Sequence, residues 1–283
     1  MSVKIKGIDV SVNNGAIDWQ KVKADGVEFA IIKATQGRDA KYPNGFVESM
    51  FEKNYAGAKA AGIQVGAYHF AVFTSSEQAI AEARQFMDAC KGKQFDYPLC
   101  LDLEDLPAGR NPILSKALTK QQLTDYAVLF MEELKRNGYR PMLYTNTDWR
   151  NNRLEFPRLS GYLLWQAHYP PNPDAKPSAI DEKVAIWQYS SAGKVNGING
   201  NVDLNWDFVG LANPSASQPL ENKPNIGDTI GSVLHTDIKA YVNDKLIPSF
   251  NIGGKTCICF EDLTDHGFKV TWDAAKREVR AWK

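Results

Sequence analysis

Runs of apolar residues recur along the first 206 residues at intervals that fit alternating strands and helices. Strands are expected at 5–10, 28–34, 63–70, 97–104, 139–145, 162–167, 184–189 and 202–206. Amphipathic helices are predicted at 46–61, 77–91 and 119–137, and each is followed by glycine, a residue that readily ends a helix. Strand, helix and strand in alternation build a parallel sheet. The pattern therefore predicts an α/β fold, an irregular or flattened (β/α) barrel of about eight strands.

The pattern changes after the eighth run. Residues 211–226 lose their periodicity and are rich in Pro, Ser and Asn, which is typical of a linker. We therefore expect a barrel domain at 1–210, a linker at 211–226 and a second domain at 227–283. Strands predicted at 238–242, 246–250 and 255–260, a short helix at 261–266 and a hairpin of 270–272 with 278–282 make this second domain a small α+β unit.

The predicted fourth strand ends in two carboxylates. Asp102 and Glu104 are spaced i, i+2, so both side chains leave the same face of the strand. The preceding residues are apolar, and charges are costly in a core, so the two acids are expected where the strand emerges into a cleft. Two carboxylates this close cannot both ionise freely, so the pKa of one is expected to rise. That group could donate a proton near neutral pH.

The other strand ends add to this picture, because the active site of a β/α barrel lies at the carboxyl ends of its strands. Asp9 ends the first strand and Asp203 lies in the eighth, which gives four acids on one rim. The other residues expected there are Lys33, Tyr68, His69, Tyr144, Asn146, Trp165, Gln166, Trp187 and Gln188. Aromatic faces stack on sugar rings while amides and acids bind hydroxyls. The set is therefore typical of a carbohydrate cleft.

Charge and composition disfavour several other functions. Lys plus Arg equals Asp plus Glu at 33 each, so no basic field attracts nucleic acid or an anionic membrane. No apolar stretch reaches about 18 residues, so membrane insertion is not expected. The strand pattern begins too early for a signal peptide. The four histidines show no ligand spacing, so neither a metal nor another cofactor is expected. The four cysteines are predicted to be buried free thiols: Cys90, Cys100, Cys257 and Cys259.

Eight segments follow one another in a recognisable order: GIDVS at 7–11, AIIKAT at 30–35, GAYHF at 66–70, LDLE at 101–104, LYTN at 143–146, LWQA at 164–167, WQY at 187–189 and VDLN at 202–205. Together they resemble glycoside hydrolase family 25, the lysozymes that cleave the bond between N-acetylmuramic acid and N-acetylglucosamine in peptidoglycan. The resemblance implies that Glu104 is the general acid/base, Asp102 its partner, and Asp9 and Asp203 supporting acids. One departure is Gln36, where family members often carry Glu.

The resemblance also implies a mechanism and a place of action. Glu104 would protonate the glycosidic oxygen and later deprotonate water, and the products would retain their configuration. Asp102 is expected either to be the nucleophile or to orient the substrate's own N-acetyl group, and the sequence leaves both routes open. We predict a lysozyme of the phage endolysin or bacterial autolysin type that acts on the bacterial cell wall. It is expected to remain in the host cytoplasm until its release, or to be a secreted enzyme whose signal peptide has been removed.

Two other functions are alternatives to hydrolysis of peptidoglycan. A non-catalytic peptidoglycan-binding protein on the same fold is the alternative, and the intact set of four acids argues against it. A chitin-cleaving barrel enzyme typically carries a longer acidic series, D-x-x-D-x-D-x-E, on its fourth strand, and residues 97–101 lack those extra acids.

The second domain carries a weaker resemblance. Its segments YVN at 241–243, IPSF at 247–250 and EDL at 261–263 are similar to the small domain named for copper amine oxidase N-termini, which implies no copper here. This domain lacks an acid cluster, so its expected role is to bind a wall polymer and raise the local substrate concentration. A structural or dimerisation role is the alternative.

Overall fold

The computed structural model describes residues 4–39, 41–171 and 177–212, together with the backbone of strands between 229 and 282. The chain divides into two compact units, Met1–Pro219 and Leu220–Lys283, which are described separately. Apart from residues 211 and 212, the predicted linker lies outside the described residues. Within the described part, no helix is both long enough and apolar enough to cross a membrane.

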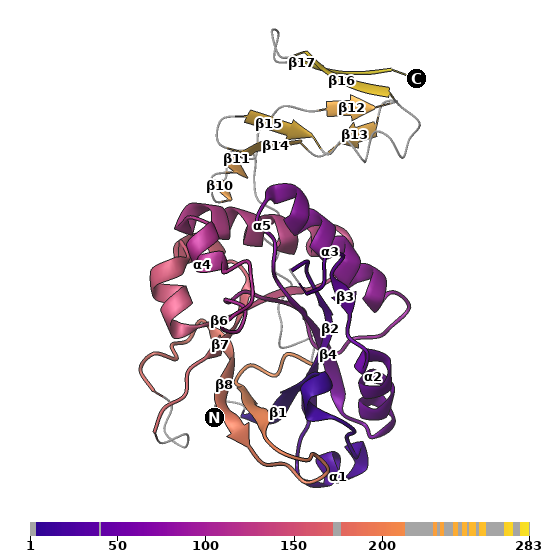
Figure 1. Ribbon diagram of the computed structural model, residues 1–283, viewed down its shortest axis with the longest axis vertical. Coiled ribbons are helices and arrows are strands. Elements are labelled where there is room, and N and C mark those ends of the chain that lie inside the picture. Colours follow the sequence, from indigo (N-terminus) through magenta and orange to yellow (C-terminus); the bar gives the residue numbers. More distant parts are fainter. Residues whose placement is uncertain are drawn as a thin grey trace. The chain divides into compact units, whose positions relative to one another are not determined.

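Eight strands of the first unit close into a barrel (Figure 1). In order around it they are β1 (Ile5–Val10), β2 (Phe29–Gln36), β4 (Gln64–Phe70), β5 (Leu99–Asp102), β6 (Pro141–Asn146), β7 (Leu163–Ala167), β8 (Val184–Gly193) and β9 (Val202–Asp207). Neighbours are parallel from β1 to β8, whereas β9 is antiparallel to both β8 and β1. The connection from β8 to β9 holds no helix, so the chain turns back directly. The predicted irregular barrel is confirmed.

The helices lie outside this barrel (Figure 1). They are α1 (Trp19–Ala24), α2 (Phe51–Ala60), α3 (Ser76–Cys90), α4 (Leu114–Ala117) and α5 (Lys120–Arg136), with short 3-10 or π turns η1 (Val12–Asn14), η2 (Trp149–Arg153) and η3 (Phe156–Leu159). The predictions for α3 and α5 are correct to within one residue at each end. The predicted helix at 46–61 starts too early, because β3 (Phe46–Val47) pairs antiparallel with β2 before α2 begins.

Local sequence explains where the two long helices begin. Thr119 and Gln122 form a capping box at the start of α5: the Thr119 hydroxyl accepts from the Gln122 amide N–H at 3.2 Å, and the Gln122 side chain accepts from the Thr119 N–H at 3.0 Å. At the start of α3 the Ser75 hydroxyl accepts from the Gln78 N–H at 3.3 Å. These bonds satisfy backbone donors that have no partner within a helix.

The barrel interior is closed at its base by packed rings. Phe29 and Tyr97 stack with their ring centroids 4.5 Å apart, inside a buried cluster with Met142. Glycine is needed beside them at position 7, because a Cβ there would lie 2.2 Å from the Phe29 ring. This packed base leaves the carboxyl ends of the strands as the end at which a cleft can open.

Asp207 is predicted to stabilise this base. Its fully buried carboxylate accepts the Tyr97 hydroxyl at 2.8 Å and the backbone N–H groups of Val209, Gly210 and Leu211 at 2.8 to 3.0 Å. Asp207→Asn places an NH₂ group against these donors, so we expect the free energy of unfolding to fall by about 3 kcal/mol. Urea denaturation measures this change.

Tyr97→Phe is the matched control, because it removes one of the four hydrogen bonds and leaves the carboxylate in place. It should cost about 1 kcal/mol. Equal losses in the two variants would contradict a dominant role for the Asp207 carboxylate.

In the second unit the described strands pair in antiparallel fashion. One sheet has the order β10 (Thr229–Ile230), β11 (Val233–Leu234), β14 (Ser249–Ile252) and β15 (Lys255–Ile258), and two hairpins join β12 (Ala240–Val242) to β13 (Lys245–Ile247) and β16 (Lys269–Asp273) to β17 (Glu278–Trp282). The predicted hairpin of 270–272 with 278–282 coincides with β16 and β17. The strand predicted at 246–250 instead spans parts of β13 and β14, which belong to different sheets. The helix predicted at 261–266 and the side chains of Cys257 and Cys259 lie outside the described residues, whereas Cys90 and Cys100 are buried free thiols.

Candidate active site

The barrel brings the four predicted acids to one end. Asp102 ends β5, and Glu104 follows two residues later. Asp9 and Asp203 are direct partners in the register of β1 and β9. Because β9 runs opposite to the other strands, its amino end meets their carboxyl ends, which places Asp203 on the same rim. Asp9 and Asp102 are each 6% exposed, and Glu104 and Asp203 are half-buried.

Asp9 is held by two amide side chains. Asn205 Nδ2 and Gln188 Nε2 donate to its Oδ2 at 2.7 and 2.9 Å. Burial raises the pKa of Asp9 well above its usual range, and the charge of Asp203 raises it further, whereas the two amide bonds lower it. Asn205 was not among the residues predicted for the site. Its spacing of i, i+2 from Asp203 on one strand could have indicated it.

The orientations of these amides are fixed by aromatic donors. The indole N–H of Trp165 donates to Asn205 Oδ1 at 2.7 Å. The hydroxyls of Tyr144 and Tyr169 donate to Gln188 Oε1 at 2.9 and 2.6 Å. Trp165 and Tyr144 are 1% and 7% exposed, so neither presents a free ring face to a sugar. They were predicted as substrate-binding residues, and the structure places them beneath the site, where they orient Asn205 and Gln188.

Asp102 and Glu104 differ in their surroundings. Asp102 Oδ1 is buried and has no hydrogen-bond partner in the described structure. Burial raises the pKa of Asp102 well above its usual range, and the charge of Glu104 raises it further. Burial also raises the pKa of Glu104 to about 7, with Asp203 as the next cause. Glu104 is therefore suited to donate a proton near neutral pH.

The predicted cause of this shift needs a correction. The sequence suggested that Asp102 raises the pKa of Glu104, whereas the acid whose charge does so most is Asp203. Asp102 is the more deeply buried of the pair. The repulsion between the two acids appears instead in the pKa of Asp102, which the charge of Glu104 raises.

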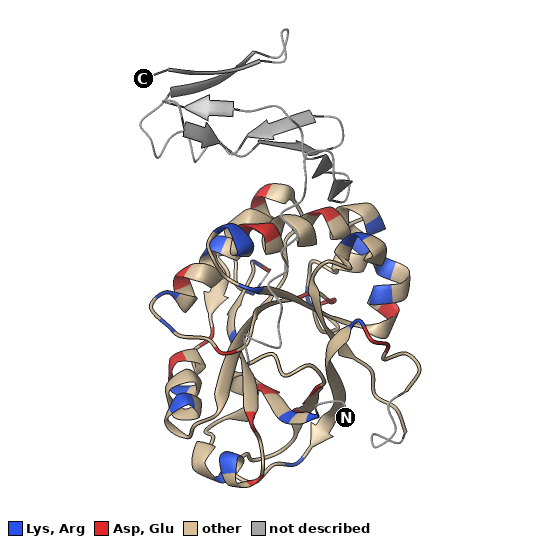
Figure 2. Cartoon of the chain, turned by 180° about the vertical axis from the view of Figure 1, so that it is seen from behind, with Lys and Arg blue, Asp and Glu red and all other residues tan. Residues whose placement is uncertain are grey.

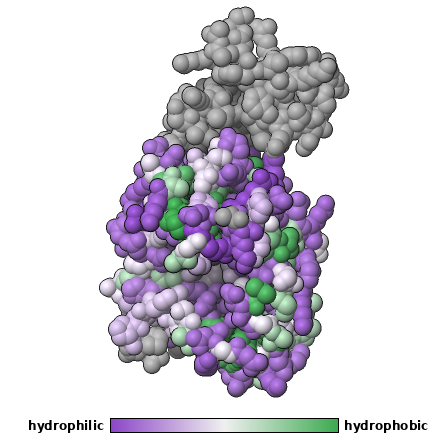
Figure 3. All heavy atoms as spheres, viewed as in Figure 1, coloured by the Kyte–Doolittle hydropathy of each residue, from purple (hydrophilic) through white to green (hydrophobic). Residues whose placement is uncertain are grey.

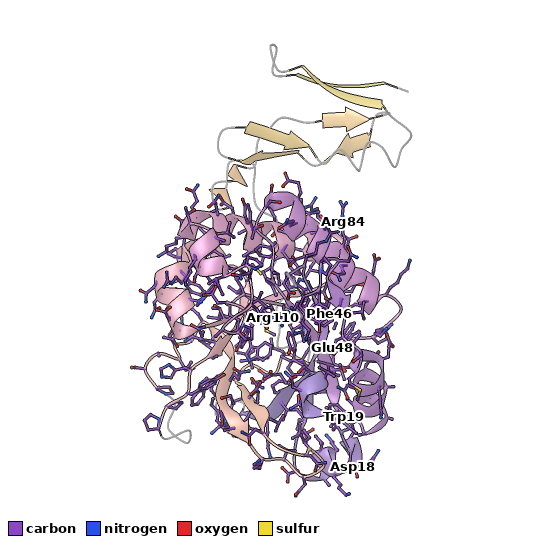
Figure 4. All side chains as sticks on the ribbon, in the orientation of Figure 1. Asp18, Trp19, Phe46, Glu48, Arg84 and Arg110 are labelled. Atoms are coloured by element: carbon purple, nitrogen blue, oxygen red, sulfur yellow. The ribbon has the colours of Figure 1, made fainter. Side chains whose placement is uncertain are left out.

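Lys33 provides a positive charge at this rim. Its Nζ donates to Gln36 Oε1 at 2.9 Å and lies 5.1 and 5.5 Å from the ring centroids of Phe70 and Phe46. Figure 4 labels Phe46 on β3, at the edge of the sheet next to β2. Burial lowers the pKa of Lys33, and the charge of Asp102 opposes that change. Lys33 in turn lowers the pKa of both Asp102 and Glu104.

The position of Gln36 links Lys33 to two loops. Gln36 Nε2 donates to Asp39 Oδ2 at 2.8 Å, and the same carboxylate pairs with Arg110, also labelled in Figure 4. The loop after β2 is thereby tied to the loop after β5. A neutral amide at position 36 accepts from Lys33 without adding a negative charge to the rim.

His69 does not line this site. It lies fully buried on the outer side of β4, with Thr35 Oγ1 2.7 Å from its Nδ1 and Glu82 Oε2 2.9 Å from its Nε2. The rings of Phe86 in α3 and Phe130 in α5 pack at 5.8 and 5.2 Å. The prediction that His69 binds substrate conflicts with this placement under the helices.

Gln166 and Trp187 also face outward. Gln166 Oε1 accepts from Arg150 Nη1 at 2.7 Å, and the Trp187 indole N–H donates to the His168 carbonyl at 2.8 Å. Side chains alternate along a strand, so only one residue of each adjacent pair can enter the barrel. The inward members are Tyr68, Trp165 and Gln188. The predictions for His69, Gln166 and Trp187 are therefore corrected.

The remaining predicted residues lie at the rim. Tyr68 is half-buried with its ring 6.3 Å from that of Trp165, and burial followed by the charge of Asp9 raises its pKa. Asn146 Oδ1 accepts from the Trp149 N–H at 3.0 Å, so the side-chain carbonyl of Asn146 caps the turn η2. Within the described part, no three His, Cys, Asp or Glu side chains are grouped so that they could hold a metal ion.

The pKa of Glu104 predicts the pH dependence of the reaction. A general acid must be protonated, so kcat/KM should fall tenfold for each pH unit above a midpoint of about 7. The profile is measured on soluble glycan chains from peptidoglycan. Activity that stays level to pH 9 would contradict Glu104 as the acid. The surface variant Glu52→Gln, whose carboxylate is 71% exposed on α2, should leave the midpoint unchanged.

Comparisons with known proteins agree with this geometry. The sequence pattern of Glycosyl hydrolases family 25 matches residues 8–198. Lysozyme M1 of Streptomyces globisporus is 34% identical over 209 residues, which are 71% of this chain and 67% of that protein. The autolytic lysozyme of Clostridium acetobutylicum is 30% identical over 200 residues, 71% of this chain and 55% of that protein.

A solved structure extends the comparison to the fold. The bacterial lysozyme from Streptomyces coelicolor superposes with a TM-score of 0.59 at 32% identity, over 71% of this chain and 90% of that protein. The residues matched by the family, 8–198, contain Asp9, Asp102 and Glu104. The chain therefore belongs to glycosyl hydrolase family 25 and is a glycoside hydrolase.

Proposed function

We propose that this protein is a lysozyme that hydrolyses the β-1,4 bond between N-acetylmuramic acid and N-acetylglucosamine in bacterial peptidoglycan. The observation that carries the proposal is Glu104, a carboxyl group whose pKa burial raises to about 7, on a barrel rim that also carries Asp9, Asp102 and Asp203. The names of the relatives, lysozyme and autolytic lysozyme, support the same substrate.

In the first step Glu104 donates its proton to the oxygen that links the two sugars. The C1–O bond of the muramic acid residue breaks, and positive charge develops on that sugar. Asp102 acts on the same carbon or on the N-acetyl group beside it. As a nucleophile it would form a covalent glycosyl ester. As a partner of the acetamido group, its unpaired Oδ1 would accept the amide N–H while the acetyl oxygen attacks C1.

In the second step Glu104, now ionised, removes a proton from water. The hydroxyl adds to C1, and the bond to Asp102 or to the acetyl oxygen breaks, which returns Glu104 to its acid form. Asp9 and Asp203 do not exchange a proton with the substrate in this scheme. They set the local field and hold the positions of the groups around them, since Asp203 raises the pKa of Glu104.

Peptidoglycan is the proposed partner of the first unit, and a bacterial wall polymer that of the second. Figure 2 shows Lys and Arg residues interspersed with Asp and Glu residues over the outer helices, a distribution unsuited to binding nucleic acid. The full chain is expected to sediment with purified cell walls more completely than a chain that ends at residue 219. Equal sedimentation would favour a structural role for the second unit.

Product analysis tests the proposed activity. Purified peptidoglycan is digested, the new reducing ends are converted to alditols with borohydride, and the fragments are identified by mass spectrometry. We expect muramitol ends. Glucosaminitol ends would show cleavage of the other glycosidic bond, and the absence of new ends together with retained wall binding would favour the non-catalytic peptidoglycan-binding protein.

A further inference from the structure

Tyr169 combines an exposed ring with a location at the catalytic rim. It lies two residues beyond the last residue of β7, at the carboxyl ends of the parallel strands. Its side chain is 51% exposed, and it is the only aromatic residue among the exposed large apolar side chains of the described part. Figure 3 shows that the visible face of the first unit is mainly hydrophilic, with scattered hydrophobic residues.

The hydroxyl of this exposed ring reaches into the buried part of the site. It donates to Gln188 Oε1 at 2.6 Å, and Gln188 is 2% exposed. Gln188 Nε2 donates in turn to Asp9 Oδ2 at 2.9 Å. A single amide therefore connects the open ring of Tyr169 to one of the four acids.

One group that can only donate determines which atom donates and which accepts in each of the hydrogen bonds that join Tyr169 to Asp9. The indole N–H of Trp165 can only donate, so Asn205 turns its oxygen to Trp165 and its NH₂ group to Asp9 Oδ2. Asp9 Oδ2 then acts as an acceptor. Gln188 presents its own NH₂ group to that oxygen, so its carbonyl must accept from Tyr169.

The proton of Asp9 is located by the same reasoning. Since Oδ2 accepts two N–H donors, any proton on this carboxyl lies on Oδ1. Asp9 forms a side-chain hydrogen bond with Asp203, its direct partner across β1 and β9. A change in the orientation of Gln188 would therefore alter a carboxyl pair that includes Asp203, the acid whose charge most raises the pKa of Glu104.

The charges around Tyr169 keep its hydroxyl in the donating form. Burial raises its pKa, and the charges of Asp9, Asp203 and Glu104 raise it further. Because only Gln188 lies between the hydroxyl of Tyr169 and Asp9, the hydrogen bonds place this ring beside the acids of the rim.

We propose that Tyr169 is a substrate-contacting and positioning residue: its exposed face stacks on a pyranose ring of the glycan, and its hydroxyl, through Gln188, holds Asp9 in the orientation used by the reaction. The proposal rests on the lysozyme function proposed above. It adds a residue that links occupancy of the cleft by a sugar to the geometry of the acid pair Asp9 and Asp203.

Two substitutions separate the ring from the hydroxyl. Tyr169→Phe keeps the stacking face and removes one hydrogen bond, so kcat should fall about fivefold while KM changes less than twofold. Tyr169→Leu removes both features, so KM should also rise about fivefold. Both constants are measured on soluble glycan chains. Tyr162→Phe is the control, because it loses a comparable hydroxyl bond, to Glu132 Oε1 at 2.6 Å on α5.

A double-mutant cycle tests the route through Gln188. In Gln188→Met the amide is absent, so adding Tyr169→Phe should lower kcat no further. Should that variant not fold, Tyr144→Phe serves instead: Tyr169 is then the remaining tyrosine donor to Gln188, and its removal should cost more than in the wild type. Additive effects in these backgrounds, or an unchanged kcat in Tyr169→Phe, would overturn the positioning role.

The stacking role has its own readout. Calorimetric binding of the glycan chains to the wild type and to Tyr169→Leu should show about a fivefold weaker affinity for the variant. Equal affinities would overturn the contact with sugar. If the wild type binds these chains but releases no muramic acid ends, the lysozyme proposal is contradicted. The proposed contact of Tyr169 with sugar is then tested by the binding data alone.

Discussion

Replacing Glu104 with glutamine is expected to lower kcat on peptidoglycan by about 10³-fold. The amide has nearly the same shape, but it cannot give a proton to the leaving oxygen or take one from water, and such acid–base catalysis contributes 10² to 10⁴-fold in enzymes, by order of magnitude. The measurement is the rate of new reducing ends from soluble glycan chains. Retained hydrolysis within about tenfold of the wild type would reject Glu104 as the general acid.

The stability of the same variant shows whether it still folds. Burial raises the pKa of Glu104 from its ordinary value of 4.5 to about 7 in the folded state. The wild type therefore loses stability as the pH rises from 4.5 through 7, whereas glutamine has no such loss. At pH 8 Glu104→Gln should be more stable, by up to about 3 kcal/mol, and the difference should vanish at pH 4. Thermal unfolding at both pH values checks this.

Replacing Asp102 with asparagine is expected to lower kcat by about 10²- to 10³-fold. Asp102 Oδ1 is buried without a partner, so it is available to C1 or to the acetamido N–H of the substrate. An amide is a poor nucleophile and a weaker acceptor, and both routes lose their charge stabilisation. Asp148→Asn is the control, because that carboxylate is 60% exposed. Equal rates for the wild type and Asp102→Asn would remove Asp102 from the mechanism.

A second variant distinguishes the two routes open to Asp102. Asp102→Ala leaves space beside C1, which an added azide ion can occupy. If Asp102 is the nucleophile, azide should restore cleavage and leave a glycosyl azide of inverted configuration at the muramic acid residue. If the N-acetyl group attacks instead, azide should give no such product. Mass spectrometry detects the glycosyl azide, and NMR gives its configuration.

The strand and helix pattern could be predicted because it depends on local sequence. Apolar runs, capping residues such as Thr119, and glycines after helices act over a few residues. The pair Asp102 and Glu104 was recognisable for the same reason, since the alternation along a strand is independent of the rest of the fold. The carboxyl ends of parallel strands meet at one end of a barrel. Asp9, which ends another of the predicted strands, could therefore be predicted to lie on the same rim.

The side of the barrel that each residue faces was decided by the tertiary structure. Strand β4 is buried on both faces, so the apolar pattern gave no preference between Tyr68 and His69. The fold places Tyr68 at the acids and His69 under the helices. The same ambiguity explains the errors at Gln166 and Trp187.

The sequence by itself determined the barrel, the four acids and the chemistry available to them. The tertiary structure decided that β9 runs backward, so that Asp203 meets Asp9 and is the acid that most raises the pKa of Glu104. It also decided that Tyr169 joins the site through Gln188. The physical reason is that alternation and capping are local properties, whereas hydrogen-bond partners and the repulsion between charges depend on distances across strands that are far apart in the chain.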